Sequence, residues 1–232
     1  MNDANIHVLS NVIAAVESGG QIYSDNRDWT AYAGAYTNSE KEVTCTLGPY
    51  QAYGGEAQEV CQYVLDHYPA TMVSCDRTGN IRYYLKQGFV KSQWNPNATD
   101  KANLIMMLGT KAGHEACEHV FDERLLKYIA NAEAFGVTDI QAQMMWAEIE
   151  HLGGLNPVKR VFGRCGGNYT LSSVFEALKE DQSQTGSNSV SSQKYWSRHT
   201  ACVSMIEDLS ESEAEIVFNA NYSLAKTAAI CA

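Results

Sequence analysis

Apolar residues recur with the helical period of about 3.6 along most of the chain. Between residues 5 and 16 they follow the i, i+3, i+4, i+7 spacing of one buried helix face, at Leu9, Val12, Ile13 and Val16. The same pattern predicts further helices over 56–68, 99–108, 113–134, 140–152, 171–178 and 193–209. From about residue 98 onward, we therefore expect only helices.

Capping residues stand at several of the expected helix starts. Thr99 with Asp100, Thr138 with Asp139, and Thr170 each precede a helical stretch. Their side-chain oxygens can accept hydrogen bonds from the unpaired N–H groups of a first helical turn. Pro69 follows the stretch over 56–68 and marks its expected end.

Residues 21–53 have a different character, because they are rich in Tyr, Thr, Asn and Gly. The run Val-Thr-Cys-Thr-Leu at 43–47 favours a strand, and we expect a small irregular sheet or hairpin there. The predicted fold class is mainly α with a small β segment (α+β). We expect a single domain over 1–209, with one lobe over 1–95 and a helical lobe over 96–209. Residues 210–232 would form a further helix or a tail.

Composition narrows the classes of function. The 232 residues are 45% hydrophobic, which is enough apolar material for a core. Lys and Arg number 17 against 27 Asp and Glu, a net charge of −10 that disfavours nucleic acid as a partner. No apolar run approaches the roughly 18–20 residues of a membrane span. The N-terminus lacks the pattern of a secretory signal, so we expect synthesis in the cytoplasm without a signal peptide.

The spacing of the cysteines and histidines does not match a metal-binding motif. The seven cysteines are scattered and include no C-x-x-C pair, so we expect reduced thiols that pack as small apolar side chains. His114 and His119 are five residues apart and would lie about 140° apart around a helix. A zinc helix needs its two histidines four apart. No metal and no organic cofactor is implied.

A carboxylate at a helix end is the first candidate for catalysis. Glu17 closes the predicted helix over 5–16, immediately before Ser18 and two glycines. The C-terminal end of a helix carries partial negative charge, which opposes ionisation and raises the pKa of a nearby carboxyl group. A carboxylic acid that stays protonated near neutral pH is what protonation of a glycosidic oxygen requires.

Glu42, directly before the predicted strand over 43–47, is the second candidate. Two carboxyl groups that face each other can split a sugar chain, because one donates a proton while the other activates water or stabilises the oxocarbenium ion. Flat aromatic faces for sugar rings are available at Tyr23, Trp29, Tyr50 and Tyr53. Sugar hydroxyl and acetamido groups could hydrogen-bond with Asn38, Thr46 and Gln51.

These residues form motifs that resemble a known family. Glu-Ser-Gly-Gly-Gln-x-Tyr begins at Glu17, and Glu-x-x-x-Thr-x-Gly-x-x-Gln-x-Tyr-Gly begins at Glu42. Both resemble the lysozyme-like glycosidase domains of Gram-positive phage lysins and phage-tail cell-wall hydrolases, which are related to chitosanases and goose-type lysozymes. The segments over 141–154 and 195–199 resemble the second-lobe and closing helices of these domains. The resemblance covers roughly residues 5–209.

The resemblance implies a two-lobed helical fold in which the β segment flanks a cleft. It places the general acid at Glu17 and the second carboxylate at Glu42. Rivals for that second role are Glu40, Asp25 and Asp28. The implied substrate-binding residues are Tyr23, Thr46, Gln51 and Tyr53. In the helical part, Glu148, Glu150 and Asp181 are interpreted as packing and hydrogen-bonding residues.

The expected function is hydrolysis of β-1,4 glycosidic bonds in bacterial peptidoglycan, with its glycan strands as the partner and no membrane partner. Because wall polymers are anionic, a domain of charge −10 is repelled at long range. Wall targeting is then expected from a separate domain or subunit, and release by lysis, by a holin or in a virion. A lytic transglycosylase, a chitosanase and a non-catalytic wall-binding module stay open as alternatives.

Overall fold

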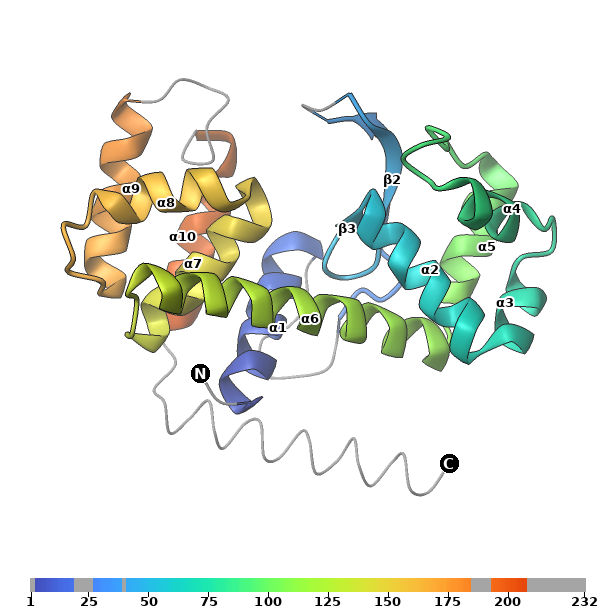
Figure 1. Ribbon diagram of the computed structural model, residues 1–232, viewed down its shortest axis with the longest axis horizontal. Coiled ribbons are helices and arrows are strands. Elements are labelled where there is room, and N and C mark those ends of the chain that lie inside the picture. The colour runs from blue at the N-terminus through green and yellow to red at the C-terminus, as the bar shows by residue number, and fades with distance from the viewer. Residues whose placement is uncertain (1–2, 19–26, 39–40, 185–192, 208–232) are drawn as a thin grey trace. The chain divides into compact units, whose positions relative to one another are not determined.

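The computed structural model describes residues 3–18, 27–38, 41–184 and 193–207 (Figure 1). Over these residues the chain is mainly helical with one small sheet, so the predicted fold class, mainly α (α+β), is confirmed. The strands are β1 (Tyr32–Thr37), β2 (Val43–Leu47) and β3 (Ala52–Tyr53). The helices are α1 (Asp3–Ser18), α2 (Gly55–His67), α3 (Pro69–Cys75), α4 (Asn80–Gln87), α5 (Ala98–Leu108), α6 (Lys111–Phe135), α7 (Ile140–Gly153), α8 (Leu155–Gly163), α9 (Leu171–Gln184) and α10 (Gln193–Glu207).

Every helix predicted from the apolar spacing is present, and β2 has the predicted bounds. Three short helices, α3, α4 and α8, were not predicted. Pro69 does follow α2, but it is also the first residue of α3. Proline is well tolerated there, because the N–H that it lacks would have no partner in the first turn of a helix.

The observed caps correct one prediction and confirm another. Helix α5 is capped by Asn97, whose side chain accepts hydrogen bonds from the backbone N–H groups of Thr99 and Asp100. The expected caps of this helix are therefore its first-turn residues. Asp139 does cap α7 by accepting from the N–H of Ala142 at 2.8 Å.

The chain divides into two compact units, which we describe separately. The sheet unit contains residues 17–18, 27–38 and 41–123 of the described chain, and the helical unit contains residues 3–16, 124–184 and 193–207. This division differs from the expected one, which placed a boundary near residue 95. Residues 96–123 group with the sheet, and most of α1 groups with the C-terminal helices.

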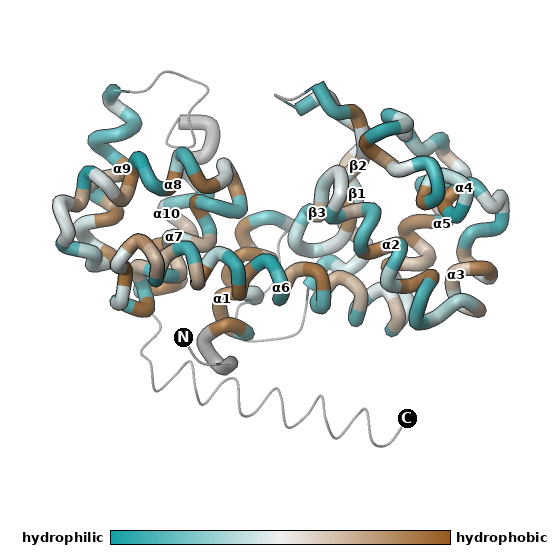
Figure 2. The backbone as a smooth tube through the Cα atoms, in the orientation of Figure 1, coloured by the Kyte–Doolittle hydropathy of each residue, from teal (hydrophilic) through white to brown (hydrophobic). Residues whose placement is uncertain are grey.

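In the sheet unit, the three strands form an antiparallel sheet in the order β1-β2-β3. Helix α2 contacts β2, β3, α3 and α4, while α5 contacts α3 and α4. Each of these helices carries both hydrophobic and hydrophilic residues (Figure 2). The apolar residues form the core of the unit, with Leu47, Val60, Val64 and Leu104 fully buried.

In the helical unit, α7 contacts α8, α9 and α10. All residues from Ala142 to Glu150 of α7 are buried, and the Trp146 ring packs edge-on against Phe162 of α8 with centroids 4.8 Å apart. Among the described helices, none has the length and the apolar character that crossing a membrane requires.

The six cysteines that the structure describes are free, and five of them are buried. Burial raises the pKa of Cys45 to about 11 and that of Cys117 to about 12. Both thiols therefore stay protonated near neutral pH and pack as small apolar groups. Cys231 lies outside the described residues.

Candidate functional site

Four of the sequence-predicted site residues lie on the small sheet or at its turns. Glu42 immediately precedes β2, Thr46 lies within it, and Gln51 and Tyr53 belong to the turn and strand that follow. Glu17 lies in the last turn of α1, is half-buried, and falls in the same compact unit as Glu42. Tyr23 and the two rival carboxylates Asp25 and Glu40 lie outside the described residues.

The strand register gathers several of these side chains on one face of the sheet. Thr46 pairs with Tyr53, and Thr44 pairs with Tyr36. Residues directly opposite each other in antiparallel strands project to the same face, as do residues two apart on one strand. We call this side of the sheet the Tyr36–Tyr53 face; it includes Tyr36, Glu42 and Tyr53, with the buried Thr44 and Thr46 beneath them in the sheet.

Glu42 is anchored to Asn38 across the turn between β1 and β2. The Asn38 side-chain amide donates to Glu42 Oε2 at 2.8 Å, and the Glu42 backbone N–H donates to Asn38 Oδ1 at 2.9 Å. The Asn38 backbone N–H also donates to the Glu42 carbonyl at 3.1 Å. These three bonds fix both the backbone of Glu42 and one oxygen of its carboxylate.

Tyr53 holds the same turn from the neighbouring strand. Its hydroxyl donates to the Glu42 carbonyl oxygen at 2.8 Å and lies 3.2 Å from the carbonyl oxygen of Tyr36. Burial, and then the negative charge of Glu42, raise the pKa of the Tyr53 phenol, so it remains a neutral donor. Tyr53 therefore has an anchoring role in addition to the predicted role in substrate binding.

Thr46 lies within β2, and Gln51 lies in the turn between β2 and β3. Thr46 is only 5% exposed. Gln51 has a left-handed backbone with φ of 52°, and its side-chain amide donates to the carbonyl of Gly48 at 3.0 Å. Their contacts with a sugar stay predictions.

Two of the aromatic residues considered for sugar stacking are packed against other side chains. Tyr50 is 2% exposed, stacks on Phe121 with centroids 3.9 Å apart, and accepts a hydrogen bond from Arg27. The expectation that Tyr50 offers a free face is therefore wrong. Trp29 is half-buried and stacks on His114 with centroids 4.2 Å apart.

Asp28, a rival second carboxylate, serves a local turn. Its Oδ1 accepts hydrogen bonds from the backbone N–H and the hydroxyl of Thr30, at 3.2 and 3.1 Å. The side chain is exposed, and these bonds explain its place in the loop without a catalytic role.

The two histidines weighed for zinc contact different aromatic rings. His114 stacks on Trp29, whereas His119 lies against Tyr63 with ring centroids 4.7 Å apart. Within the described part of the chain, no cluster of three or more His, Cys, Asp or Glu side chains is arranged to hold a metal ion.

Sequence reasoning missed Tyr36. It lies on β1, and a bulge between Ala33 and Tyr36 shifts the register there. Regular alternation would place Ala33 and Tyr36 on opposite faces, but the extra residue brings both to the same face. The run Tyr-Ala-Gly-Ala-Tyr-Thr at 32–37 contains the aromatic residues and the glycine, but it does not reveal the bulge.

No protein-family model, no curated protein and no solved structure matches the chain.

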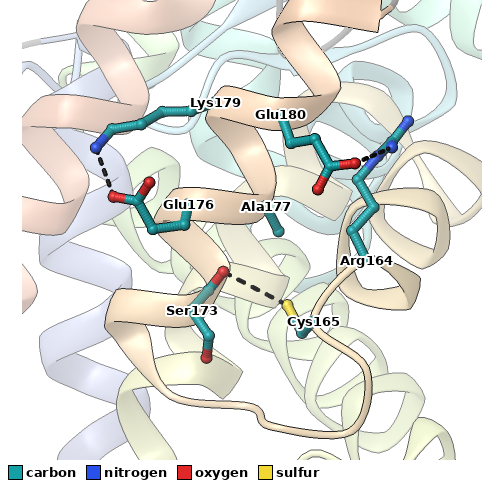
Figure 3. Close-up of a pocket in the computed structure, with 7 residues that line it drawn as sticks. All are labelled: Arg164, Cys165, Ser173, Glu176, Ala177, Lys179 and Glu180. Carbon is teal, nitrogen blue, oxygen red and sulfur yellow. Dashed lines mark hydrogen bonds and ion pairs between the residues drawn. The ribbon is translucent and has the colours of Figure 1, made fainter.

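The helical unit contains a pocket of about 610 Å³ between α9 and the turn that follows α8 (Figure 3). Its charged groups pair with one another, since Lys179 lies 2.6 Å from Glu176 and Arg164 lies 3.2 Å from Glu180. Burial raises the pKa of the Cys165 thiol, which disfavours the nucleophilic thiolate. The pocket therefore presents no activated nucleophile and no excess charge.

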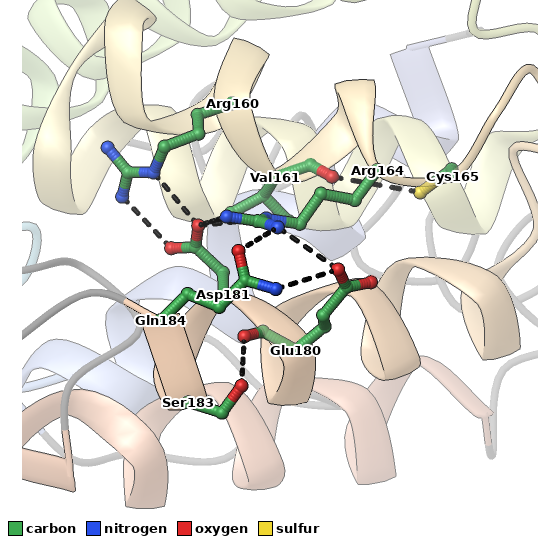
Figure 4. Close-up of polar contacts among 8 residues, drawn as sticks. All are labelled: Arg160, Val161, Arg164, Cys165, Glu180, Asp181, Ser183 and Gln184. Carbon is green, nitrogen blue, oxygen red and sulfur yellow. Dashed lines mark hydrogen bonds and ion pairs between the residues drawn. The ribbon is translucent and has the colours of Figure 1, made fainter.

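Asp181, beside this pocket, is fully buried and held by two arginines (Figure 4). Arg160 donates to both carboxylate oxygens at 2.9 Å, and Arg164 donates to Oδ1 at 3.0 Å. This geometry ties α8 to α9 through a bidentate pair. The interpretation of Asp181 as a packing residue is confirmed.

The two buried glutamates of α7 also have partners for their oxygens. Glu148 contacts Nδ1 of the fully buried His199 through both carboxylate oxygens, at 3.1 and 2.8 Å. Glu150 accepts from Asn131 and from the Trp146 indole, both at 2.7 Å. These carboxylates connect helices, as the sequence indicated. The candidate functional site is therefore the Tyr36–Tyr53 face.

Proposed function

We propose that the protein hydrolyses β-1,4 glycosidic bonds of bacterial peptidoglycan. The observation that carries this proposal is the setting of Glu42. Its carboxylate is fixed by Asn38 but half-buried, and aromatic side chains lie on the same sheet face. Such a carboxylate is pre-oriented and can still meet a substrate.

In the proposed reaction, Glu17 protonates the glycosidic oxygen as the sugar–oxygen bond breaks. Glu42 accepts a proton from the attacking water, whose oxygen bonds to the anomeric carbon. If water attacks directly, the anomeric configuration inverts, and a carboxyl separation of roughly 6.5–9.5 Å accompanies that outcome. The half-buried position of Glu17 at a helix end supports its role as the acid.

The experiment compares four full-length proteins on purified Gram-positive peptidoglycan: the wild type, Glu17→Gln, Glu42→Gln and the control Glu207→Gln. Glu207 is an exposed residue at the end of α10. Released fragments are identified by mass spectrometry. We expect reducing sugar ends from the wild type and the control, released about 100-fold more slowly or not at all by Glu17→Gln and Glu42→Gln.

Other outcomes separate the alternatives. Anhydro-sugar ends together with an active Glu42→Gln protein would show a lytic transglycosylase, which uses a hydroxyl group of its substrate. Release of sugars from chitosan but not from peptidoglycan would show a chitosanase. A wild type that binds the wall and releases no sugar ends would contradict the proposal.

A further inference from the structure

Tyr36 is an exposed aromatic residue of β1. It is 49% exposed, and the bulge in β1 directs it to the face that carries Glu42. Bulges re-aim side chains and are common beside functional sites. About half of this side chain therefore remains accessible to solvent.

The Tyr36 ring is held in place by Tyr53. The two ring centroids are 4.8 Å apart with a tilt of 35°, and the Tyr53 hydroxyl lies within hydrogen-bond distance of the Tyr36 carbonyl. Because one side of Tyr36 is supported, its ring is already restricted before a ligand arrives. Such pre-organisation lowers the entropy that binding costs.

Polar groups stand beside this aromatic surface. Tyr53 also bonds to the Glu42 backbone, and Asn38 fixes Oε2 of the Glu42 carboxylate. An aromatic ring beside a carboxylate and an amide matches a pyranose, whose C–H groups form an apolar face and whose rim carries hydroxyl and acetamido groups. The Glu42 charge and the net charge of −10 disfavour an anionic ligand instead.

We propose that the Tyr36–Tyr53 face is a saccharide subsite, in which one pyranose ring of a β-1,4-linked N-acetyl amino sugar chain stacks on Tyr36. This inference rests on the proposed function for the identity of the sugar. Tyr36 is the stacking residue, and Tyr53 is a positioning residue that supports its ring.

The test measures binding of a β-1,4-linked N-acetylglucosamine tetramer by calorimetry. The full chain carries Glu17→Gln in every sample so that the tetramer stays intact. Added to it are Tyr36→Ala, Tyr36→Phe or the control Tyr83→Ala, which removes a tyrosine of α4 that is 56% exposed. We expect Tyr36→Ala to weaken binding at least about tenfold, and Tyr36→Phe and Tyr83→Ala to change it less than about twofold.

A second measurement needs no change at Tyr36. In the Glu17→Gln protein, the NMR signals of the Tyr36 and Tyr53 rings are followed as the tetramer is added. We expect both to shift in a saturable manner while Tyr83 does not. The deacetylated tetramer serves as a second probe, and tighter binding of that polycation would identify a chitosan-type ligand on the same subsite.

The outcomes distinguish this inference from the proposed function. If the tetramer does not bind at millimolar concentration, or if a folded Tyr36→Ala protein binds it as tightly as its parent, the subsite does not exist. Ring signals of Tyr36 that stay unchanged at saturation would also overturn it. If the tetramer binds through Tyr36 but the wild type cleaves no glycan, the subsite stands and the hydrolase proposal fails.

Discussion

Glu42 in the sheet unit and Asp181 in the helical unit are both carboxylates fixed by hydrogen bonds, yet their surroundings differ. Asp181 is fully buried, and two arginines donate to its two oxygens. Glu42 is half-buried, and Asn38 holds one of its oxygens. Asp181 joins α8 to α9 through its ion pairs. Glu42 is oriented and keeps the exposure that a reaction requires.

The same contrast applies to the other polar groups of the two units. In the helical unit, Glu148 and Glu150 are buried and connect neighbouring elements. On the Tyr36–Tyr53 face, the hydrogen bonds hold side chains in place beside an exposed ring. A structural carboxylate is buried with partners on both oxygens, whereas a candidate catalytic carboxylate is oriented but remains partly exposed.

Removing the charge of Asp181 is expected to have the largest effect among the changes that test this contrast. Asp181→Asn leaves two guanidinium groups without their carboxylate, and we expect the free energy of unfolding to fall by about 3 kcal/mol. Urea unfolding followed by circular dichroism measures the change. The control Glu180→Gln removes an exposed partner of Arg164 and should cost less than about 1 kcal/mol. Equal losses in the two variants would contradict the structural role of Asp181.

For Glu42→Gln we expect the reverse, a large loss of activity with little change in stability. We expect kcat/KM on soluble glycan fragments to fall by about 100-fold, because the general base is lost. The free energy of unfolding should change by less than about 1 kcal/mol, since glutamine can still accept the bond from Asn38. Full activity in a folded Glu42→Gln protein would remove Glu42 from the mechanism.

Asn38→Ala probes the anchoring of Glu42. We expect kcat to fall about tenfold with little change in KM, because the base remains but loses its orientation. Rate measurements over a range of substrate concentration separate the two constants. The control Asn168→Ala removes an exposed asparagine of the helical unit. Lower stability with an unchanged kcat would mean that Asn38 serves only the turn.

The smallest expected effect concerns His114, whose pKa is lowered by burial beside Trp29. The unfolded chain binds a proton near pH 6.5, whereas the folded chain binds it only at lower pH. The free energy of unfolding therefore keeps the full contribution of His114 above pH 6.5. It decreases as the pH falls, by less than about 1 kcal/mol. Urea unfolding at pH 7.5 and 5.5 measures the loss. His114→Gln should reduce the pH dependence, whereas the exposed control His67→Gln should preserve it.

Most of the long helices could be predicted from the sequence. The apolar spacing of α1 and the capping residue Asp139 of α7 are local signals, and both agree with the structure. The short helices α3, α4 and α8 could not be predicted, because so few turns give too little periodicity. Their formation depends on packing against neighbours, as α3 packs against α2 and α5.

The candidate site was predictable only in part. The sequence drew attention to Glu42, Thr46 and Tyr53, which the register brings to one face of the sheet. It misjudged Tyr50, which the fold buries against Phe121, and it overlooked Tyr36. Aromatic side chains suit a core as well as a sugar, so residue type alone does not decide between these roles.

The helical class, the small strand at 43–47 and the order of the main elements follow from the amino-acid sequence alone, because helix period and capping depend on neighbours along the chain. Which polar groups are buried with partners and which stay exposed depends on tertiary packing. Asp181 meets Arg160 and Arg164, and Tyr36 reaches Tyr53 across a bulged sheet. Such contacts join residues distant in the chain, and burial and register, which no local pattern encodes, decide them.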